Sequence, residues 1–422
     1  MLEPVESIEG LDVKKAINEI ESLTEKHNQW RKKECINLIA SENVTSPAVD
    51  KIYVSDLGHR YAEGKPFNRH YQGLQYVDKI EDLTQKLAKQ LFDAKYVDLR
   101  PLSGTTANLS ALGALTNYGD TIISSSIPNG GHVSHTRYGV SGLIGIKDFS
   151  FPFNIDEMNI DIDATKKKIE EKQPKVLLFG ASLFLFPHPV KEIADFAKSY
   201  GTRIIYDAAH VLGLIAGKRF QDPLREGAEL ITTSTHKTFP GPQSGMIFGN
   251  TDDFEKIETV VFPQVICNHH LHKLPAMAVA LEEMTTHGHS YAKQIITNAK
   301  TLAQSMHELG FAVVAENKGF TESHQVVVDV SQFGGGKPVA ELLESMNIIL
   351  NKNFIPGDEV NSETMRNPRG IRIGTQEMTR MGMKEEEMKM IAELMKKALV
   401  DKKDIKDEVV GFRKNFLDVK YC

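Results

Sequence analysis

Cysteine, tryptophan and long apolar runs are scarce in this chain. Its 422 residues include one tryptophan and three cysteines, Cys35, Cys267 and Cys422, which are widely spaced and form no CxxC pair. A disulfide framework is therefore not expected, and a reducing cytoplasm is the predicted location. The longest mostly apolar run, Val176 to Pro187, is too short to cross a membrane, and the acidic start at Met1 to Glu6 lacks a signal-peptide pattern.

A large excess of one charge sign is also lacking. The formal net charge is -6, and no basic stripe with interleaved aromatic residues is present. Binding to nucleic acid or to a membrane surface is therefore disfavoured. A composition of 41% hydrophobic and 25% charged residues is typical of a globular protein, and a chain of this length predicts two or three domains.

Short apolar runs alternate with helical segments in the first two thirds of the chain. Amphipathic spacing predicts helices over Val77–Phe92, Thr105–Leu115 and Val190–Tyr200. Strand-like runs occupy 121–124, 176–179, 203–206, 230–233 and 245–248. Continuous apolar strands separated by helices predict an α/β fold with a mainly parallel sheet covered on both faces.

The two ends of the chain show other patterns. Residues 11–33 predict a helix with Leu11, Ile17, Ile20 and Leu23 near helical spacing, and Ser46-Pro47 predicts a helix start. After residue 273, helices are expected at 274–287 and 290–309, followed by apolar runs, a glycine-rich loop at 334–338 and charged helices from 384. This last part predicts a smaller α+β domain.

A lysine among hydroxyl residues marks the segment from Ile231 to Gly245, which contains Ser234-Thr-His-Lys237-Thr. A lysine amine attacks carbonyl groups only when its surroundings favour the neutral form. On its own, such a segment is more often a strand end followed by a solvated surface lysine.

Three further segments place polar groups where strands end and helices begin. In Pro101–Asn108, a Ser-Gly-Thr turn before a helix offers an anion cup, although the motif alone favours plain helix capping, which needs only one of the hydroxyls. The Gly-Lys-Ser/Thr of a nucleotide loop is missing, which disfavours an NTPase. Asn129–His135 follows a strand-like run, at the position of a βα loop, and contains two histidines beside a glycine pair. Asp207 ends an apolar run, and it would share a helical face with His210 if a helix began there.

Together these segments resemble the parts of a pyridoxal-phosphate enzyme of the aspartate-aminotransferase fold. Among such enzymes, the chain most resembles the serine hydroxymethyltransferase family. This resemblance extends roughly from residue 28 to 382. Its motifs are Leu38-Ile-Ala-Ser-Glu-Asn43, Arg60-Tyr-Ala-Glu-Gly64, Asp207-Ala-Ala-His-Val211, Ser234-Thr-His-Lys-Thr238 and Gly370-Ile-Arg-Ile-Gly-Thr375.

The resemblance implies a fold and a division of the chain. A large cofactor-binding domain is expected at 56–285, built on a mainly parallel sheet of about seven strands between helices. An N-terminal helical arm is expected at 1–55 and a small C-terminal domain at 286–422. The family also implies a homodimer with shared active sites.

The resemblance also implies roles for single residues. Lys237 would bond covalently to the cofactor aldehyde, with His236 beside it. Around the cofactor it implies Asp207 at the pyridinium nitrogen, His210 and Ser182 near the phenolic oxygen, His132 stacked on the ring, and Ser103, Gly104, Thr105 and Ser234 at the phosphate. For the amino acid it implies Arg372, Ser41 and Tyr71, with Tyr61 and Glu63 from the neighbouring subunit, where Glu63 transfers a proton. For the pterin it implies Gly130, Gly131, His132 and Asn353.

The chain departs from the family pattern at several positions. Gln243 stands where the family usually has Arg, Cys267-Asn268 where a glycine pair contacts the phosphate, and His70 where a Tyr is usual. These changes resemble the archaeal branch, whose pterin can be tetrahydromethanopterin. The run His269-His270-Leu-His272 invites a metal interpretation, but no fourth ligand lies in register, so no metal is expected.

The expected function is the interconversion of L-serine and glycine, with transfer of the hydroxymethyl carbon to a reduced pterin, either tetrahydrofolate or tetrahydromethanopterin. One alternative is a pterin-independent aldolase with the same cofactor, such as a threonine aldolase. The motifs around Ser41 and Glu63 favour the transferase. A binding protein that has lost its chemistry is disfavoured because Lys237, Asp207 and Arg372 are all present.

Overall fold

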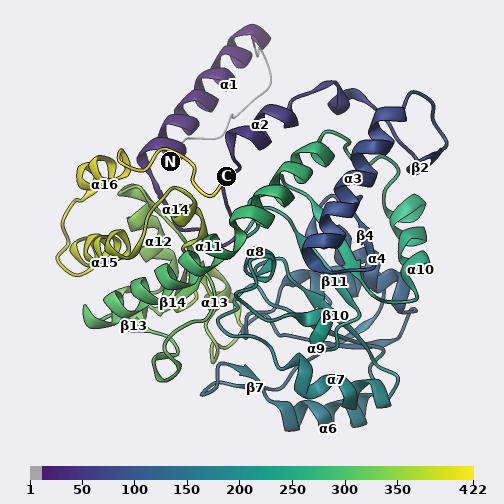
Figure 1. Ribbon diagram of the computed structural model, residues 1–422. Helices are drawn as coiled ribbons and strands as arrows, with labels where there is room; N and C mark the ends of the chain where they lie inside the picture. Colours follow the sequence, from purple (N-terminus) through teal and green to yellow (C-terminus); the bar gives the residue numbers. More distant parts are fainter. Residues whose placement is uncertain (1–11) are drawn as a thin grey trace.

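A seven-stranded sheet lies inside the larger part of the molecule (Figure 1), in a computed structural model that describes residues 12–422. Its strand order is β4-β12-β11-β10-β9-β5-β6. The strands are β4 (Tyr96–Asp98), β5 (Thr121–Ser124), β6 (Lys147–Ser150), β9 (Val176–Phe179), β10 (Arg203–Asp207), β11 (Leu230–Ser234) and β12 (Gly245–Gly249). Only β12 is antiparallel to its neighbours. The predicted mainly parallel α/β sheet is therefore confirmed.

The observed strands agree closely with the apolar runs in the sequence. Two of them, 121–124 and 176–179, have the predicted bounds, and the other three extend one residue further. These added residues include Asp207 and Ser234, so polar groups continue the strand ladder at its carboxyl end. At Asp207 and Ser234 the apolar pattern of the sequence therefore ends one residue before the strand does.

Both faces of the sheet are covered, because alternate strand residues enter two different cores. Leu177 and Phe179 join one apolar cluster, whereas Val176 and Leu178 join the other. The covering helices are α3 (Gln75–Phe92), α4 (Gly104–Leu115), α5 (Val140–Leu143), α6 (Ile162–Lys172), α7 (Val190–Ser199), α8 (Leu212–Ala216), α9 (Pro223–Glu226) and α10 (Phe254–Thr259). Short hairpins β2–β3 (Gly64–Lys65, Asn68–Arg69) and β7–β8 (Phe153–Asn154, Asn159–Ile160) lie outside this sheet.

One helix of 36 residues, α11 (Lys273–Glu308), replaces the two predicted helices at 274–287 and 290–309. The prediction of a break at Gly288 is wrong, because the helix continues through this buried glycine and packs closely against the end of α8. The close approach requires a glycine at Gly217, where an added Cβ would lie 2.4 Å from the Gly288 carbonyl oxygen. The predicted boundary between 285 and 286 falls inside this helix, and the division into domains stays a prediction.

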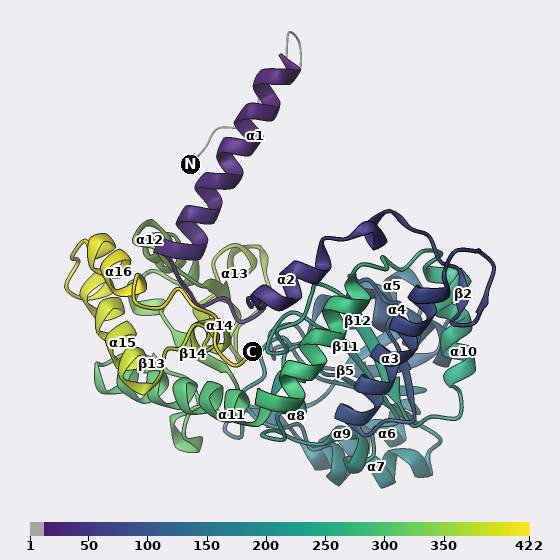
Figure 2. The same cartoon turned by 45° about the horizontal axis from the view of Figure 1, so that its top comes forward.

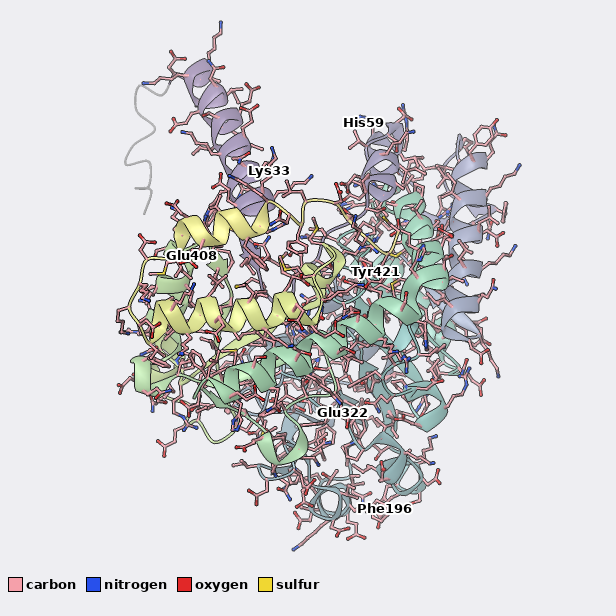
Figure 3. All side chains as sticks on the ribbon, turned by 60° about the vertical axis from the view of Figure 1, so that its left-hand side comes forward. Lys33, His59, Phe196, Glu322, Glu408 and Tyr421 are labelled. Atoms are coloured by element: carbon pink, nitrogen blue, oxygen red, sulfur yellow. The ribbon has the colours of Figure 1, made fainter. Side chains whose placement is uncertain are left out.

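A second core surrounds the far end of α11 (Figure 3). It contains an antiparallel sheet of order β13-β14-β17-β16. Its elements are β13 (Ala312–Val313), β14 (Gln325–Asp329), α12 (Gly336–Ser345), β15 (Ile348–Ile349), β16 (Asn351–Asn353), α13 (Ser362–Arg366), β17 (Gly370–Gly374), α14 (Gln376–Arg380), α15 (Glu385–Leu399) and α16 (Lys406–Arg413). The predicted loop at 334–338 is wrong in its second half, because α12 begins at Gly336.

The N-terminal segment is attached to this second core. Strand β1 (Ile36–Asn37) pairs with β15, and Ile36 is fully buried. Helix α1 (Val13–His27) continues as a π-helix over Asn28–Glu34 and projects away from the rest of the chain in both views (Figures 1 and 2). The predicted helix is confirmed within the described residues, but its apolar positions Ile17, Ile20 and Leu23 are exposed. Leu11 and the segment Met1 to Glu6 lie outside those residues.

A buried ion pair joins α11 to α14. The Arg380 guanidinium donates to Glu283 at 2.6 Å, and the Ser46 hydroxyl donates to the same carboxylate at 2.5 Å. Ser46 also caps α2 (Pro47–Tyr53) by accepting from the Val49 amide, as the sequence predicts. Among residues 12–422, no helix is long and apolar enough to cross a membrane.

We predict that Arg380→Met lowers the free energy of unfolding by roughly 3–5 kcal/mol, because it leaves the buried Glu283 carboxylate without its cation. The measurement is urea denaturation followed by circular dichroism. Lys389→Met is the matched control, since Lys389 pairs with Glu386 in solvent, and it should change stability little. Equal effects of the two substitutions would contradict the prediction.

Candidate active site

The candidate residues gather where the central strands end. Asp207 is the last residue of β10, Ser234 is the last residue of β11, and Lys237 follows three residues later. The loops after β4 and β5 leave the same edge of the sheet, because these strands run in the same direction. Ligands of α/β proteins bind at this carboxyl edge.

Asp207 is a buried carboxylate with several donors. Its Oδ2 accepts from Asn108 Nδ2 at 2.8 Å and is 2.8 Å from His135 Nε2, while its Oδ1 accepts from the Ala209 amide at 2.9 Å. Burial alone would raise the pKa of Asp207, but the hydrogen bonds with His135 and Asn108 hold it well below the usual range. The carboxylate is therefore ionised at neutral pH.

His210 does not share a helical face with Asp207, and that prediction is wrong. Residues 208–211 form a turn closed by the Val211 amide on the Ala208 carbonyl, and α8 begins only at Leu212. The side chain of His210 instead contacts β14, where its Nδ1 lies 3.0 Å from Gln325 Nε2. Because the amide nitrogen can only donate, Nδ1 accepts, and burial holds the pKa of His210 well below its ordinary value.

Lys237 combines burial with two charged neighbours. Burial lowers its pKa to about 8, with Asp207 opposing this shift and Arg372 adding to it. Its carbonyl oxygen accepts from Asn43 Nδ2 at 2.6 Å, which holds the backbone in place. The adjacent His236 also has a lowered pKa, about 4, because of burial. A substantial fraction of Lys237 is therefore neutral amine near pH 8.

The start of α4 faces the end of β11. Ser103 caps this helix, with its Oγ accepting from the Thr106 amide at 3.1 Å, so the capping interpretation is confirmed for this hydroxyl. The first N–H groups of any helix lack partners inside it, which places the amides of Gly104 and Thr105 at an anion-binding position. Ser234 Oγ is buried without a hydrogen-bond partner in the described chain, and a Cβ built on Gly104 would lie 3.5 Å from Ser234 Cβ.

A glycine turn after β5 positions His132. Gly130 has a φ of 89°, and a Cβ built on Gly131 would lie 1.9 Å from the Ser125 carbonyl oxygen, so a side chain there would clash. His132 Nδ1 is 2.7 Å from Ser134 Oγ, and burial lowers the pKa of His132 to about 4. A neutral, partly buried imidazole ring results.

Arg372, on β17, is a buried cation without a carboxylate partner in the described residues. It donates to the Ser182 carbonyl oxygen at 2.6 Å and to Asn351 Oδ1 at 3.3 Å, and its Nε has no partner there. Burial lowers its pKa to about 10, so it stays charged. A buried charge of this kind needs an anion.

Two other predicted residues lie nearby. Asn353 lies on β16 beside β17, and its side chain donates to the Phe354 carbonyl oxygen. Ser41 lines a cleft of about 940 Å³ together with Asn43, His236 and Gln243. This cleft reaches the backbone that carries Lys237, and Gln243 is exposed in it.

Tyr61, Glu63 and Tyr71 are not brought to this site within one chain. The rings of Tyr61 and Tyr71 lie 5.3 Å apart. The β2–β3 hairpin, which lies between them in the sequence, is at the outer edge of the molecule beyond α3 (Figure 1). No hydrogen bond or ion pair between residues 12 and 422 links them to Lys237, Asp207 or Arg372. The side chains of Tyr61 and Tyr71 are about half exposed.

Sequence reasoning missed several residues that hold the site together. Asn108 bridges Asp207, Ser134 and Thr232, while His135 contacts Asp207 directly. Both residues occur in segments singled out from the sequence, and Asn43 ends another. The burial of Asn108 and His135, visible only in three dimensions, was the missing signal.

The histidine run has structural contacts. His269 Nε2 lies 3.0 Å from Glu81 Oε2 in a buried pair, and His272 packs edge-on against Tyr53. Across the described residues, no group of three or more His, Cys, Asp or Glu side chains is arranged to hold a metal ion. Asn268 contacts the segment just before β2. Its Oδ1 accepts from the Ala62 amide, and its Nδ2 donates to the Arg60 carbonyl oxygen.

The comparisons with known proteins agree with this geometry. A model of the serine hydroxymethyltransferase family matches residues 13–395. The serine hydroxymethyltransferase of Staphylothermus marinus is 53% identical over 409 residues, covering 96% of this chain and 93% of that protein. That of Methanosphaera stadtmanae is 52% identical over 403 residues, covering 96% and 95%.

A solved structure shares the fold. The L-threonine transaldolase of Pseudomonas fluorescens, in its internal aldimine state, superposes with a TM-score of 0.88 at 29% identity, covering 96% of this chain and 92% of that one. The sheet and helices described above are those of pyridoxal-phosphate enzymes of the aspartate-aminotransferase fold type. Within that class, the chain belongs to the serine hydroxymethyltransferase family.

We predict that the amine of Lys237 reacts with a midpoint near pH 8 in the cofactor-free protein, because its lowered pKa makes the neutral form predominant above that pH. The measurement is trace labelling with acetic anhydride across a pH series, read by mass spectrometry. Asp207→Asn removes the anion that favours the ammonium form and should move the midpoint lower. A midpoint near the ordinary lysine value of about 10.4 would contradict the prediction.

Proposed function

We propose that this protein is a pyridoxal-phosphate-dependent glycine hydroxymethyltransferase. It interconverts L-serine and glycine and passes the hydroxymethyl carbon to a reduced pterin. The observation that carries the proposal is the buried Lys237, which interacts electrostatically with an ionised carboxylate, Asp207, and with a buried guanidinium, Arg372, that has no carboxylate partner among residues 12–422. The family membership supports the same reaction.

The residues present fit the cofactor. Lys237 supplies a partly neutral amine for the aldehyde, and Asp207 supplies a negative charge for a pyridinium nitrogen. Ser103, Gly104 and Thr105 offer hydroxyl and helix-start donors to the phosphate, and the unpartnered Ser234 Oγ adds one more. His132 provides a ring face, while His210 and Ser182 are assigned to the phenolic oxygen. When bound, pyridoxal phosphate supplies an electron sink for charge that develops on the amino acid.

The amino acid is held through its carboxylate in this proposal. Arg372 offers two parallel N–H donors, a geometry that matches a carboxylate and that lysine does not reproduce. Its present contacts with Ser182 and Asn351 fix the guanidinium from one side. Ser41 and His236 line the adjoining cleft, where they contact the rest of the substrate.

The pterin is assigned to the loop at Gly130, Gly131 and His132 and to Asn353. The glycines allow the backbone to approach closely, and Asn353 has an amide suited to hydrogen bonds with a heterocycle. Both tetrahydrofolate and tetrahydromethanopterin present such a heterocycle. The archaeal relatives Staphylothermus marinus and Methanosphaera stadtmanae motivate testing both.

A homodimer with shared sites is part of the proposal. Tyr61, Glu63 and Tyr71 lie apart from Lys237 within one chain, so they would act in the neighbouring subunit, where Glu63 transfers a proton. The exposed apolar positions of α1 support self-association, because an amphipathic helix gains stability by burying that face. The three cysteines form no disulfide, consistent with the proposed cytoplasmic location.

We expect serine-dependent one-carbon transfer by the purified protein, assayed side by side with tetrahydrofolate and tetrahydromethanopterin. Borohydride reduction should fix the cofactor on Lys237, as read by peptide mass spectrometry. Lys237→Ala should abolish both the labelling and the transfer, since no other residue is proposed to bond the cofactor. Lys300→Met, at an exposed position, is the control.

The same assay separates the alternative reaction. Fast threonine cleavage, together with serine cleavage that neither pterin affects, would identify a pterin-independent aldolase instead. The likeness to a threonine transaldolase is the observation that keeps this alternative in the test. Labelling at another lysine, or no bound cofactor, would contradict the proposal as a whole.

The shared site predicts complementation between two inactive variants. Glu63→Gln and Lys237→Ala subunits, mixed and reassembled, should regain about a quarter of the wild-type activity, because random pairing leaves one of four sites with both residues intact. Activity is measured before and after reversible dissociation. Mixtures that stay inactive, although mass spectrometry shows mixed dimers, would place Glu63 outside the partner's site.

A further inference from the structure

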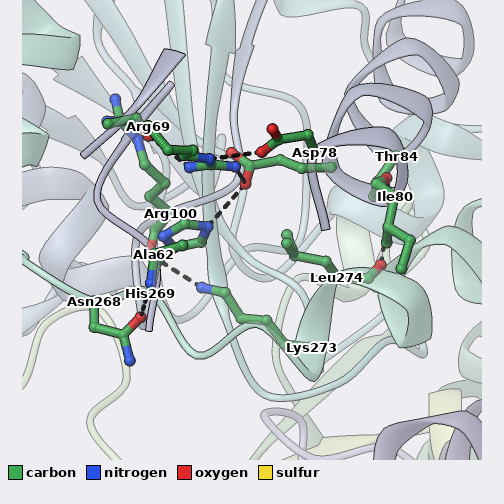
Figure 4. Close-up of polar contacts among 12 residues, drawn as sticks. Ala62, Arg69, Asp78, Ile80, Thr84, Arg100, Asn268, His269, Lys273 and Leu274 are labelled. Carbon is green, nitrogen blue, oxygen red and sulfur yellow. Dashed lines mark hydrogen bonds and ion pairs between the residues drawn. The ribbon is translucent and has the colours of Figure 1, made fainter. Parts of the chain in front are cut away.

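A buried cluster of charges includes Arg69 of the β2–β3 hairpin and Arg100, which precedes the phosphate cup in the chain (Figure 4). The phosphate cup is defined here as Ser103 to Thr105. Arg69 donates to Asp78 at 2.8 Å and to Glu81 at 2.6 Å, and Glu81 also contacts His269. Arg100 pairs with Asp98 at 2.6 Å. Each of these carboxylates already has a guanidinium partner.

Lys273 is the exception in this cluster. Lys273 is 3% exposed, and among residues 12–422 no carboxylate is hydrogen-bonded to its side chain. Its Nζ instead donates to two successive backbone oxygens, those of Arg100 at 3.1 Å and Pro101 at 2.8 Å. Burial lowers the pKa of Lys273 to about 7, although Asp98 and Glu81 act in the opposite direction. Burial of such a side chain costs free energy, so a specific contact must offset it.

The carbonyl oxygens that Lys273 binds belong to the segment that leads into the phosphate cup. Pro101 O also accepts from the Gly245 amide at 3.0 Å and from Ser244 Oγ at 3.1 Å. Arg100 O has Lys273 as its hydrogen-bond donor. The first residue of the 36-residue helix α11 therefore fixes the chain two residues before Ser103, at the same carbonyl oxygen that the Gly245 amide of β12 contacts.

We propose that Lys273 is a positioning residue for the phosphate cup, which it orders by holding the Arg100 and Pro101 carbonyls in one place. The inference rests on the proposed pyridoxal-phosphate function. Lys273 does not touch the cofactor in this arrangement. It acts through the backbone, since a shift at Pro101 moves the amides of Gly104 and Thr105 away from a position suited to an anion.

A role in ordering the cup makes a selective prediction about ligands. Pyridoxal phosphate depends on the cup, whereas pyridoxal lacks the phosphate and depends on the other residues. Lys273→Met keeps a long, unbranched side chain but removes the donors and the charge. Loss of a charge-assisted hydrogen bond should weaken pyridoxal phosphate binding by about tenfold or more and leave pyridoxal binding within about twofold.

The experiment titrates cofactor-free wild-type protein, Lys273→Met and Lys300→Met with each compound and follows visible absorbance. Lys300 lies exposed on the same helix, so its substitution controls for the loss of a lysine. Lys273→Gln, which keeps two N–H donors, should lose less affinity than Lys273→Met. If the methionine variant does not fold, the glutamine variant is compared with wild type in the same way.

Three results would separate the possibilities. Unchanged affinity of Lys273→Met for pyridoxal phosphate overturns the inference. An equal loss for pyridoxal and pyridoxal phosphate also overturns it, because it indicates a general structural effect. Failure of the wild-type protein to bind pyridoxal phosphate would instead contradict the proposed function.

Discussion

The buried carboxylate of Asp207 is the constraint on which the rest of the site depends. An ionised group inside a protein costs several kcal/mol unless charge and hydrogen bonds compensate it. Here the compensation comes from His135, Asn108 and the Ala209 amide, which belong to three different segments of the chain. Satisfying one carboxylate therefore fixes the loop after β5, helix α4 and the turn after β10 relative to one another.

The same contacts continue outward as a connected network. Asn108 accepts from Thr232 on β11 at 2.6 Å and donates to Ser134, which in turn contacts His132. In such networks each hydrogen bond orients the next, and a low dielectric strengthens all of them. These hydrogen bonds hold the proposed ring face, His132, and the proposed pyridinium partner, Asp207, in fixed positions relative to each other.

Local features of the sequence were sufficient for the strands and for most of the motifs. The apolar runs of the strands, the helix cap at Ser103 and the family motifs all depend on neighbouring residues. The unbroken α11, the early start of α12 at Gly336 and the turn at His210 were mispredicted, because packing of distant segments decided them. A glycine often ends a helix, yet α11 continues through Gly288, whose backbone packs closely against Gly217. The buried partners Asn108 and His135 also required the three-dimensional arrangement.

The continuous helix α11 links the two apolar cores mechanically. Its first half contributes Leu281 and Met284 to the core of the large sheet, and its second half contributes Leu302 and Met306 to the other core. A helix of this length measures about 54 Å at 1.5 Å per residue, and it bends only gently. The two cores therefore share one continuous helix, and we expect any relative movement between them to be a tilt of that helix and not a swing on a flexible linker.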